Sequence, residues 1–324
     1  MLMLAVVLLS TSCSLRSPSA GAGHSDHTPD SANTLGMNSA SHRLTMPVPP
    51  MTLTSDSARM EYVASHYWQS LDLRDTTWIA DTTSLEAAFY GWAELLTHLP
   101  QHRAAELTGG FIARIAADTT ARQGMLQRMA SVSEYYFAHP NSPFRNEEFY
   151  IPVLRALIAA PRLGEYEKIR PQYQLERALK NRPGAVAADF SYTTADGSKK
   201  RLSALSGEYT LLFFYNPDCH DCARVKEYIA ASQVLIPLIA SARVKVLAVY
   251  TDEDVKLWRE RLPLMPQGWE VGYNTELLAA QTYDLRAIPC LYLLGKQKRV
   301  ILKDAPVEQI EVWLKQNIIN KTHE

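Results

Sequence analysis

This sequence has few cysteines, almost no net charge and no unusual hydrophobic content. Its 324 residues include four cysteines, which are too few for a scaffold held together by disulfides. Its 33 basic and 34 acidic residues nearly cancel, so nothing indicates binding to nucleic acid or to a membrane through a basic patch. A hydrophobic fraction of 47% is ordinary for a globular chain, and the length favours two domains. The function must therefore be inferred from local motifs.

The first apolar run, residues 1–12, is too short to span a bilayer but suits the apolar core of a signal peptide. The segment Leu9-Ser10-Thr11-Ser12-Cys13 resembles a loose bacterial lipobox. The resemblance implies a signal and lipobox segment over residues 1–13 and a lipid anchor at Cys13. The protein would then be a cell-envelope lipoprotein of the periplasm or outer membrane. No Lys or Arg precedes the run, so a late start or an incidental cysteine stays open as an alternative.

Residues 14–55 are rich in Ser, Thr, Pro, Gly, Ala and His and show no apolar periodicity. Such a segment buries too little surface to offset the entropy of ordering it, so we expect a flexible linker. Its histidines His24, His27 and His42 lack cysteine or carboxylate partners at ligand spacing. We therefore interpret them as solvated rather than as a metal site.

Residues 56–182 carry apolar side chains at three- and four-residue spacing, which predicts a helical domain. A capping box at Thr83-Ser84-Leu85-Glu86 predicts the start of one helix. Further helices are predicted over residues 101–117, 119–138, 146–159 and 173–180. Aromatic residues at this spacing are more typical of a core than of a binding groove, and no catalytic constellation is present here.

The most informative stretch runs from Leu211 to Cys222. Its large apolar residues predict a strand buried on both faces, which ends at Asn216-Pro217. Two cysteines, Cys219 and Cys222, follow at C-x-x-C spacing where a helical pattern begins. The free N–H groups and partial positive charge of a helix N-terminus favour a thiolate at Cys219. Cys222, one turn on, is within reach to close a disulfide, so the motif indicates redox chemistry.

A second buried strand, with Pro289 at its head, is predicted over residues 286–294. An X–Pro bond is the one peptide bond that adopts cis at low cost. Together these features make the stretch from about Gly184 to Asn317 similar to a thioredoxin-fold module of the TlpA/ResA-like, peroxiredoxin-related branch of periplasmic thiol–disulfide oxidoreductases. The matching pieces are Ala188-Asp189-Phe190, Asp196-Gly197, Leu202-Ser203-Ala204-Leu205, Cys219-His220-Asp221-Cys222 and Ile288-Pro289.

This resemblance implies an α/β thioredoxin fold, a central mixed sheet flanked by helices, over residues 183–320, preceded by the all-α domain. It implies that Cys219 is the nucleophile, Cys222 the resolving cysteine and Pro289 a cis-proline. Protein disulfides would be the substrates and an upstream thiol the electron donor, with no cofactor or metal. The stretch from Glu61 to Thr77 resembles an uncharacterised helical domain that precedes thioredoxin modules in exported Bacteroidetes-type proteins, which supplies no activity.

Other interpretations of the two cysteines are weaker. Half of a zinc site needs a second C-x-x-C or a His pair, which Cys13 and Cys290 do not supply. A structural disulfide would not require a proline at the head of the second strand, where Pro289 stands. A peroxidase needs a threonine ahead of a lone cysteine, and Asn216-Pro217-Asp218 does not match that pattern.

Residues beside the thiols are candidates for tuning them. Asp218 and Asp221 disfavour a thiolate, and His220 opposes them only when protonated. This balance favours a reducing couple, although screening of both aspartates by solvent is an equal alternative. Asp218, Asp221, Glu227 and a water are the candidate proton acceptors for Cys222. Cys290 is interpreted as a small apolar core residue, with a third competing thiol as the alternative.

The sequence thus predicts a lipid-anchored protein thiol–disulfide oxidoreductase, more a reductase than an oxidase. The alternative is a non-catalytic binding module, in which the helical domain docks a partner and the thioredoxin domain is a scaffold.

Overall fold

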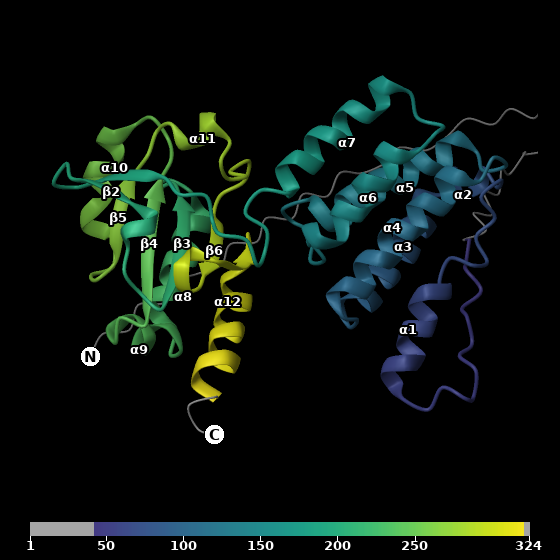
Figure 1. Ribbon diagram of the computed structural model, residues 1–324, viewed down its shortest axis with the longest axis horizontal. Coiled ribbons are helices and arrows are strands. Elements are labelled where there is room, and N and C mark those ends of the chain that lie inside the picture. Colours follow the sequence, from purple (N-terminus) through teal and green to yellow (C-terminus); the bar gives the residue numbers. More distant parts are fainter. Residues whose placement is uncertain (1–41, 321–324) are drawn as a thin grey trace, which may run out of the picture. The chain divides into compact units, whose positions relative to one another are not determined.

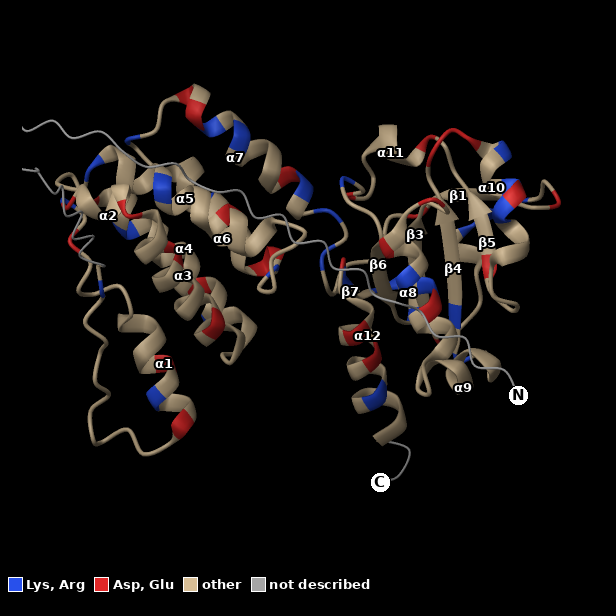
Figure 2. Ribbon diagram, turned by 180° about the vertical axis from the view of Figure 1, so that it is seen from behind, with Lys and Arg blue, Asp and Glu red and all other residues tan. Residues whose placement is uncertain are grey.

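A computed structural model describes residues 42–320 of the protein. The first part is all helical and the second is a mixed sheet with flanking helices (Figure 1), which confirms the predicted fold class. Acidic and basic residues are interspersed along both parts (Figure 2). Within the described range, no helix is both long enough and apolar enough to cross a bilayer. Cys13, His24 and His27 lie outside that range.

The helical part, residues 56–178, is built around buried aromatic rings. Its helices are α1 (Asp56–His66), α2 (Thr77–Ala80), α3 (Thr82–Thr97), α4 (Gln101–Ala117), α5 (Gln123–Ala138), α6 (Glu147–Ala159) and α7 (Glu165–Ala178). Trp68, Phe89, Trp92 and Phe111 pack against one another, and the indole N–H of Trp92 donates to the carbonyl of Ala64 at 3.0 Å. The aromatic stripes are therefore core, as predicted.

Several helix boundaries differ from the predictions for local reasons. Asp81, not the predicted Thr83, caps α3, because its carboxylate accepts from the N–H of Ser84 at 3.0 Å. Helix α5 starts four residues late, after a turn in which Asp118 accepts from the N–H of Thr120. Helix α7 starts earlier than predicted, at Glu165, and continues through Pro171.

The expectation of a flexible linker is wrong for its last part, residues 42–55. His42 is hydrogen-bonded on both ring nitrogens, at 2.8 Å to the Asp81 carboxylate and at 2.7 Å to the Thr77 hydroxyl. The N–H of Thr45 donates to the hydroxyl of Ser70 at 2.9 Å. His42 is thus a partner of the α3 cap rather than a solvated linker histidine.

The second part contains a seven-stranded mixed sheet in the order β2-β1-β5-β4-β3-β6-β7. Its strands are β1 (Ser191–Thr194), β2 (Lys199–Arg201), β3 (Tyr209–Tyr215), β4 (Val244–Tyr250), β5 (Glu270–Tyr273), β6 (Cys290–Leu294) and β7 (Val300–Lys303). Strand β3 pairs in parallel with β4 and antiparallel with β6. Asp196-Gly197, one of the pieces that carried the resemblance, forms the turn that joins β1 to β2, with Gly197 at φ +83°. The sequence analysis did not predict β5.

Helices cover the sheet and make a core on each face. They are α8 (His220–Ala231), α9 (Leu235–Ala240), α10 (Val255–Arg261), α11 (Leu277–Ala280) and α12 (Val307–Leu314). Along β3, Leu211, Phe213 and Tyr215 enter the core formed with α8 and α12, whereas Leu212 and Phe214 enter the core on the opposite face. Full burial of such side chains contributes roughly 1.5–3 kcal/mol each, so β3 anchors both layers.

Two adjacent glycines of α4 give a matched test of the packing of α4 on α6. A Cβ added at Gly109 would lie 2.7 Å from the Cβ of Pro152, whereas a Cβ at Gly110 meets nothing within 4 Å. We expect Gly109→Ala to lower the free energy of unfolding by about 1–3 kcal/mol through overpacking. Gly110→Ala should raise it by up to about 1 kcal/mol through helix propensity. Urea unfolding followed by circular dichroism measures both, and equal effects would contradict this packing.

Candidate functional site

The turn between β3 and α8 places the first cysteine. The side chain of Asn216 accepts from the N–H of Asp218 at 2.9 Å, and its backbone carbonyl accepts from the N–H of Cys219 at 3.1 Å. The amide of Asn216 also donates to Asp252 at 2.7 Å, which ties the turn to the segment after β4. The chain therefore leaves the sheet in a fixed direction and begins α8 at His220.

Cys219 is the N-cap residue of α8. Its Sγ accepts from the N–H of Cys222 at 3.2 Å and is partly exposed. The first N–H groups of a helix have no partner within the helix, and the helix dipole adds a partial positive charge there. The structure thus puts Cys219 where a thiolate is stabilised and an incoming sulfur can reach it.

Cys222 lies one turn deeper and is 2% exposed. Burial, and then the neighbouring thiol of Cys219, raises the pKa of Cys222 well above its ordinary value. Both cysteines are free thiols in this structure. One thiol of the pair is therefore reachable, and the other is shielded and neutral at physiological pH.

The predicted strand with Pro289 at its head lies directly beside the dithiol. Register pairs Phe214 of β3 with Cys290 of β6, and the Ile288–Pro289 peptide bond is cis. The carbonyl oxygen of Ile288 lies 3.9 Å from the Sγ of Cys219. The structure thus brings together the two motifs that the sequence analysis paired.

Cys290 belongs to a different layer. It packs with Phe214 and Tyr292 in the core on the sheet face opposite to that of Cys222. Its Sγ lies 3.7 Å from the carbonyl oxygen of Asp284, and burial raises the pKa of Cys290 to about 12. The position supports a small apolar core residue, because the sheet separates this thiol from the dithiol.

The charges around the dithiol differ from the expectation of two unopposed aspartates. Asp218 lies 3.5 Å from Arg261, and Asp221 lies 3.7 Å from Arg224. The side chain of His220 is 95% exposed, and its Nδ1 lies 4.0 Å from the Asp221 carboxylate. The arginines offset the carboxylates, and solvent screens all of these exposed groups. Neither arginine was named in the sequence analysis, and their positions favour the alternative given there, in which both aspartates are screened.

Cys222 borders a cavity of about 30 Å³, also lined by Tyr215, Lys226 and Arg261. A cavity needs at least about 10–15 Å³ to hold a water. None of the three carboxylates considered as proton acceptors lines it. The cavity is thus large enough for a water beside Cys222.

A larger cavity of about 290 Å³ is lined by side chains of α5, α6 and α7 and by Arg286, and it excludes the dithiol. No group of three or more His, Cys, Asp or Glu side chains over residues 42–320 is arranged to hold a metal ion.

The fold and the dithiol define a thioredoxin-like protein, and comparisons with known proteins agree. Residues 183–303 match the AhpC/TSA family, and residues 20–181 match a domain of unknown function, DUF5106. A thioredoxin-like protein from Bacteroides caccae has a solved structure with 38% identity and a TM-score of 0.81, over 85% of this chain and 99% of that one. The chain therefore belongs to the thioredoxin-like proteins that join a DUF5106 domain to an AhpC/TSA-family domain, which confirms the predicted resemblance.

Other similarities cover less of the chain. The C-terminal domain of an uncharacterised protein from Bacteroides fragilis is 42% identical, over 41% of this chain and 97% of that one, with a TM-score of 0.41. A domain of a possible thiol–disulfide isomerase from Cytophaga hutchinsonii is 20% identical, over 45% of this chain and 99% of that one, with a TM-score of 0.37. No curated protein matches this sequence.

Proposed function

We propose that this protein is a cell-envelope thiol–disulfide oxidoreductase that reduces disulfides of partner proteins through Cys219 and Cys222. The observation that carries the proposal is the dithiol geometry at the start of α8. The Sγ of Cys219 is partly exposed at the helix N-terminus, 3.9 Å from the Ile288 carbonyl, and Cys222 is buried behind it. A structural pair of thiols would need neither the exposure of one sulfur nor the shielding of the other.

The reaction proceeds in two exchange steps. The Cys219 thiolate attacks one sulfur of the substrate disulfide, and the other substrate sulfur leaves as a thiolate. Cys222 then loses its proton to water and attacks the Sγ of Cys219, which releases the second substrate thiol. Two electrons pass to the substrate, and a Cys219–Cys222 disulfide remains for an upstream thiol donor to reduce.

The backbone before Pro289 offers an edge to the substrate. The N–H of Ile288 has no hydrogen-bond partner among residues 42–320, and its carbonyl faces Cys219. An extended polypeptide that pairs with such an edge gains main-chain hydrogen bonds in the manner of an added strand. Pro289 itself has no N–H to compete for this pairing.

The direction of electron flow is argued from the buried thiol of the pair. Burial, and then the neighbouring thiol of Cys219, disfavours the Cys222 thiolate. A strongly oxidising couple requires a stabilised reduced form, so this site is suited to reduction.

Turnover of insulin disulfides tests the function. Wild type should reduce insulin in the presence of a thiol donor, and Cys219→Ser should abolish turnover. Cys222→Ser should leave attack intact, so that the mixed disulfide with substrate accumulates, with or without Cys290→Ala. In wild type, at pH values below the pKa of Cys222, the lifetime of the adduct should fall by about tenfold for each unit by which the pH is raised. The reason is that the thiolate fraction of Cys222 rises with pH. No turnover at any donor concentration would support the non-catalytic binding module, and adducts formed through Cys222 in Cys219→Ser would reverse the assigned roles.

The reduction potential tests the direction. We expect the Cys219–Cys222 couple to lie nearer the potential of thioredoxin, about −270 mV, than that of the oxidase DsbA, about −120 mV. Titration against glutathione with thiol quantification measures it. A value above about −180 mV, the region of protein disulfide isomerase, would contradict the assignment as a reductase.

Anchoring through Cys13 completes the proposal, and the sequence before Cys13 supports it. One acyl chain binds membranes only marginally, so a stable anchor needs more than one. We expect tagged wild type to sediment with membranes and Cys13→Ala to move to the soluble fraction. Identical partition of both proteins into the soluble fraction would refute the anchor.

A further inference from the structure

The loop that carries Ile288 has little structure of its own. Residues 281–289 connect α11 to β6 without a helix or strand, and Gln281 starts the loop in the left-handed region at φ +50°. The carbonyl of Ile288 nevertheless lies within 3.9 Å of the attacking sulfur. Tyr283 and Leu285 of the loop are buried in the core that contains Phe214, and further contacts to the loop come from the helical part.

The end of α7 and the residues after it hold the first half of the loop. Lys180 Nζ donates to the carbonyl of Gln281 at 2.9 Å, and Asn181 Nδ2 donates to the carbonyl of Thr282 at 2.9 Å. The side-chain oxygen of Asn181 accepts from the N–H of Ala188 at 2.8 Å. Asn181 therefore links the loop to the segment that leads into β1.

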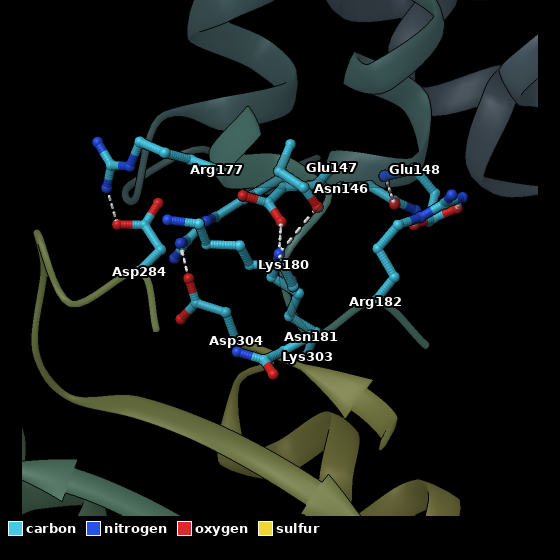
Figure 3. A network of polar contacts seen from close by, with 12 residues as sticks. Asn146, Glu147, Glu148, Arg177, Lys180, Asn181, Arg182, Asp284, Lys303 and Asp304 are labelled. Carbon is cyan, nitrogen blue, oxygen red and sulfur yellow. Dashed lines mark hydrogen bonds and ion pairs between the residues drawn. The ribbon is translucent and has the colours of Figure 1, made fainter. Parts of the chain in front are cut away.

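A buried ion pair holds the middle of the loop. Arg177 of α7 pairs with Asp284, and their side chains are 11% and 5% exposed (Figure 3). Asp284 also accepts from Arg286 at 3.0 and 2.7 Å, and Arg286 stands two residues before Ile288. Burial opposes the charge of Asp284, but Arg286 and Arg177 outweigh it and hold the pKa of Asp284 below its ordinary value.

A second clamp acts on the strand next to β6. Lys303 of β7 is paired with Glu147 of α6 at 2.6 Å and donates to the carbonyls of Ala178 and Lys180 at 3.0 and 2.6 Å. Arg145 pairs with Asp304. Lys303 stands opposite Tyr292 in the register of β6 and β7. The helical part thus makes hydrogen bonds and ion pairs both to the 281–289 loop and to β7, the strand that pairs with β6.

From these contacts we propose that the end of α7, through Arg177, Lys180 and Asn181, positions the 281–289 loop so that its Ile288 edge receives protein substrates. Arg177 is a positioning residue, since it acts through Asp284 and touches no reacting atom. The proposal rests on the proposed function and deepens it. It gives the helical domain a role in selecting polypeptide disulfides over small ones, because only a polypeptide pairs with the edge.

The experiment compares two substrates in the full-length protein, insulin and the small aromatic disulfide DTNB. Misplacement of a binding group by about 1 Å can cost on the order of 100-fold in rate. We therefore expect Arg177→Gln to lower kcat/KM for insulin at least tenfold, mainly through KM, and to change the DTNB rate less than twofold. Arg177→Lys, which keeps the charge, should restore most of the insulin activity.

Arg170→Gln is the matched control, because Arg170 lies two turns earlier on α7 and pairs with Glu134 in an exposed position. It should leave both substrates unaffected. Lys180→Met removes a single exposed contact and should give a smaller, equally selective loss even if Arg177→Gln folds poorly. Equal loss of activity on both substrates, or a wild-type rate on insulin in Arg177→Gln and Lys180→Met, would overturn the proposal while leaving the proposed function intact.

Amide hydrogen exchange gives a readout that does not depend on turnover. In Arg177→Gln we expect faster exchange in peptides covering residues 281–289 and unchanged exchange in peptides covering α8. Unchanged exchange in the loop would overturn the positioning role. Failure of wild type itself to reduce insulin would instead refute the proposed function, and the selection of protein substrates with it.

Discussion

The pairing of β3 with β6 is the constraint on which the site depends. Strand β3 ends where the dithiol helix begins, and β6 begins immediately after Pro289. The register of Phe214 opposite Cys290 therefore fixes the distance between the helix N-terminus and the loop before β6. A slip of one residue would exchange the two faces of β3, moving Phe213 and Phe214 into the wrong cores. The burial of Phe213 and Phe214 in opposite cores thus fixes the register, and the register fixes the geometry of the site.

The different environments of the two thiols follow from helix geometry. A C-x-x-C at a helix start puts its first sulfur at the cap and its second one turn inward, against the sheet. In this protein the cap position leaves Cys219 partly exposed, and the inward position buries Cys222 among the side chains of β3 and α8. This difference in exposure is what supports the roles proposed for the two thiols.

Features with a local signal were predictable, and features that depend on distant partners were not. The continuous apolar run of β3, the C-x-x-C and the X–Pro strand start each carry their own signal, as does α4, whose bounds were exact. Strand β5 is four residues long and includes a glycine, so its pattern is too short to recognise. Arg261 reaches Asp218 only because the fold brings α10 beside the active-site turn. Arg224, at helical spacing from Asp221, was readable from the sequence and was missed.

The buried charge of Asp284 explains why the helical part and the redox site belong to one structure. A carboxylate that is 5% exposed must be paired, because an unpaired buried charge costs several kcal/mol. Arg286 is its neighbour in the loop, but the second cation comes from α7, more than a hundred residues earlier in the chain. Removing α7 would leave the carboxylate with one partner that is itself more than half exposed. The helical part thus supplies one of the two cations that allow Asp284 to stay charged while buried, four residues before Ile288.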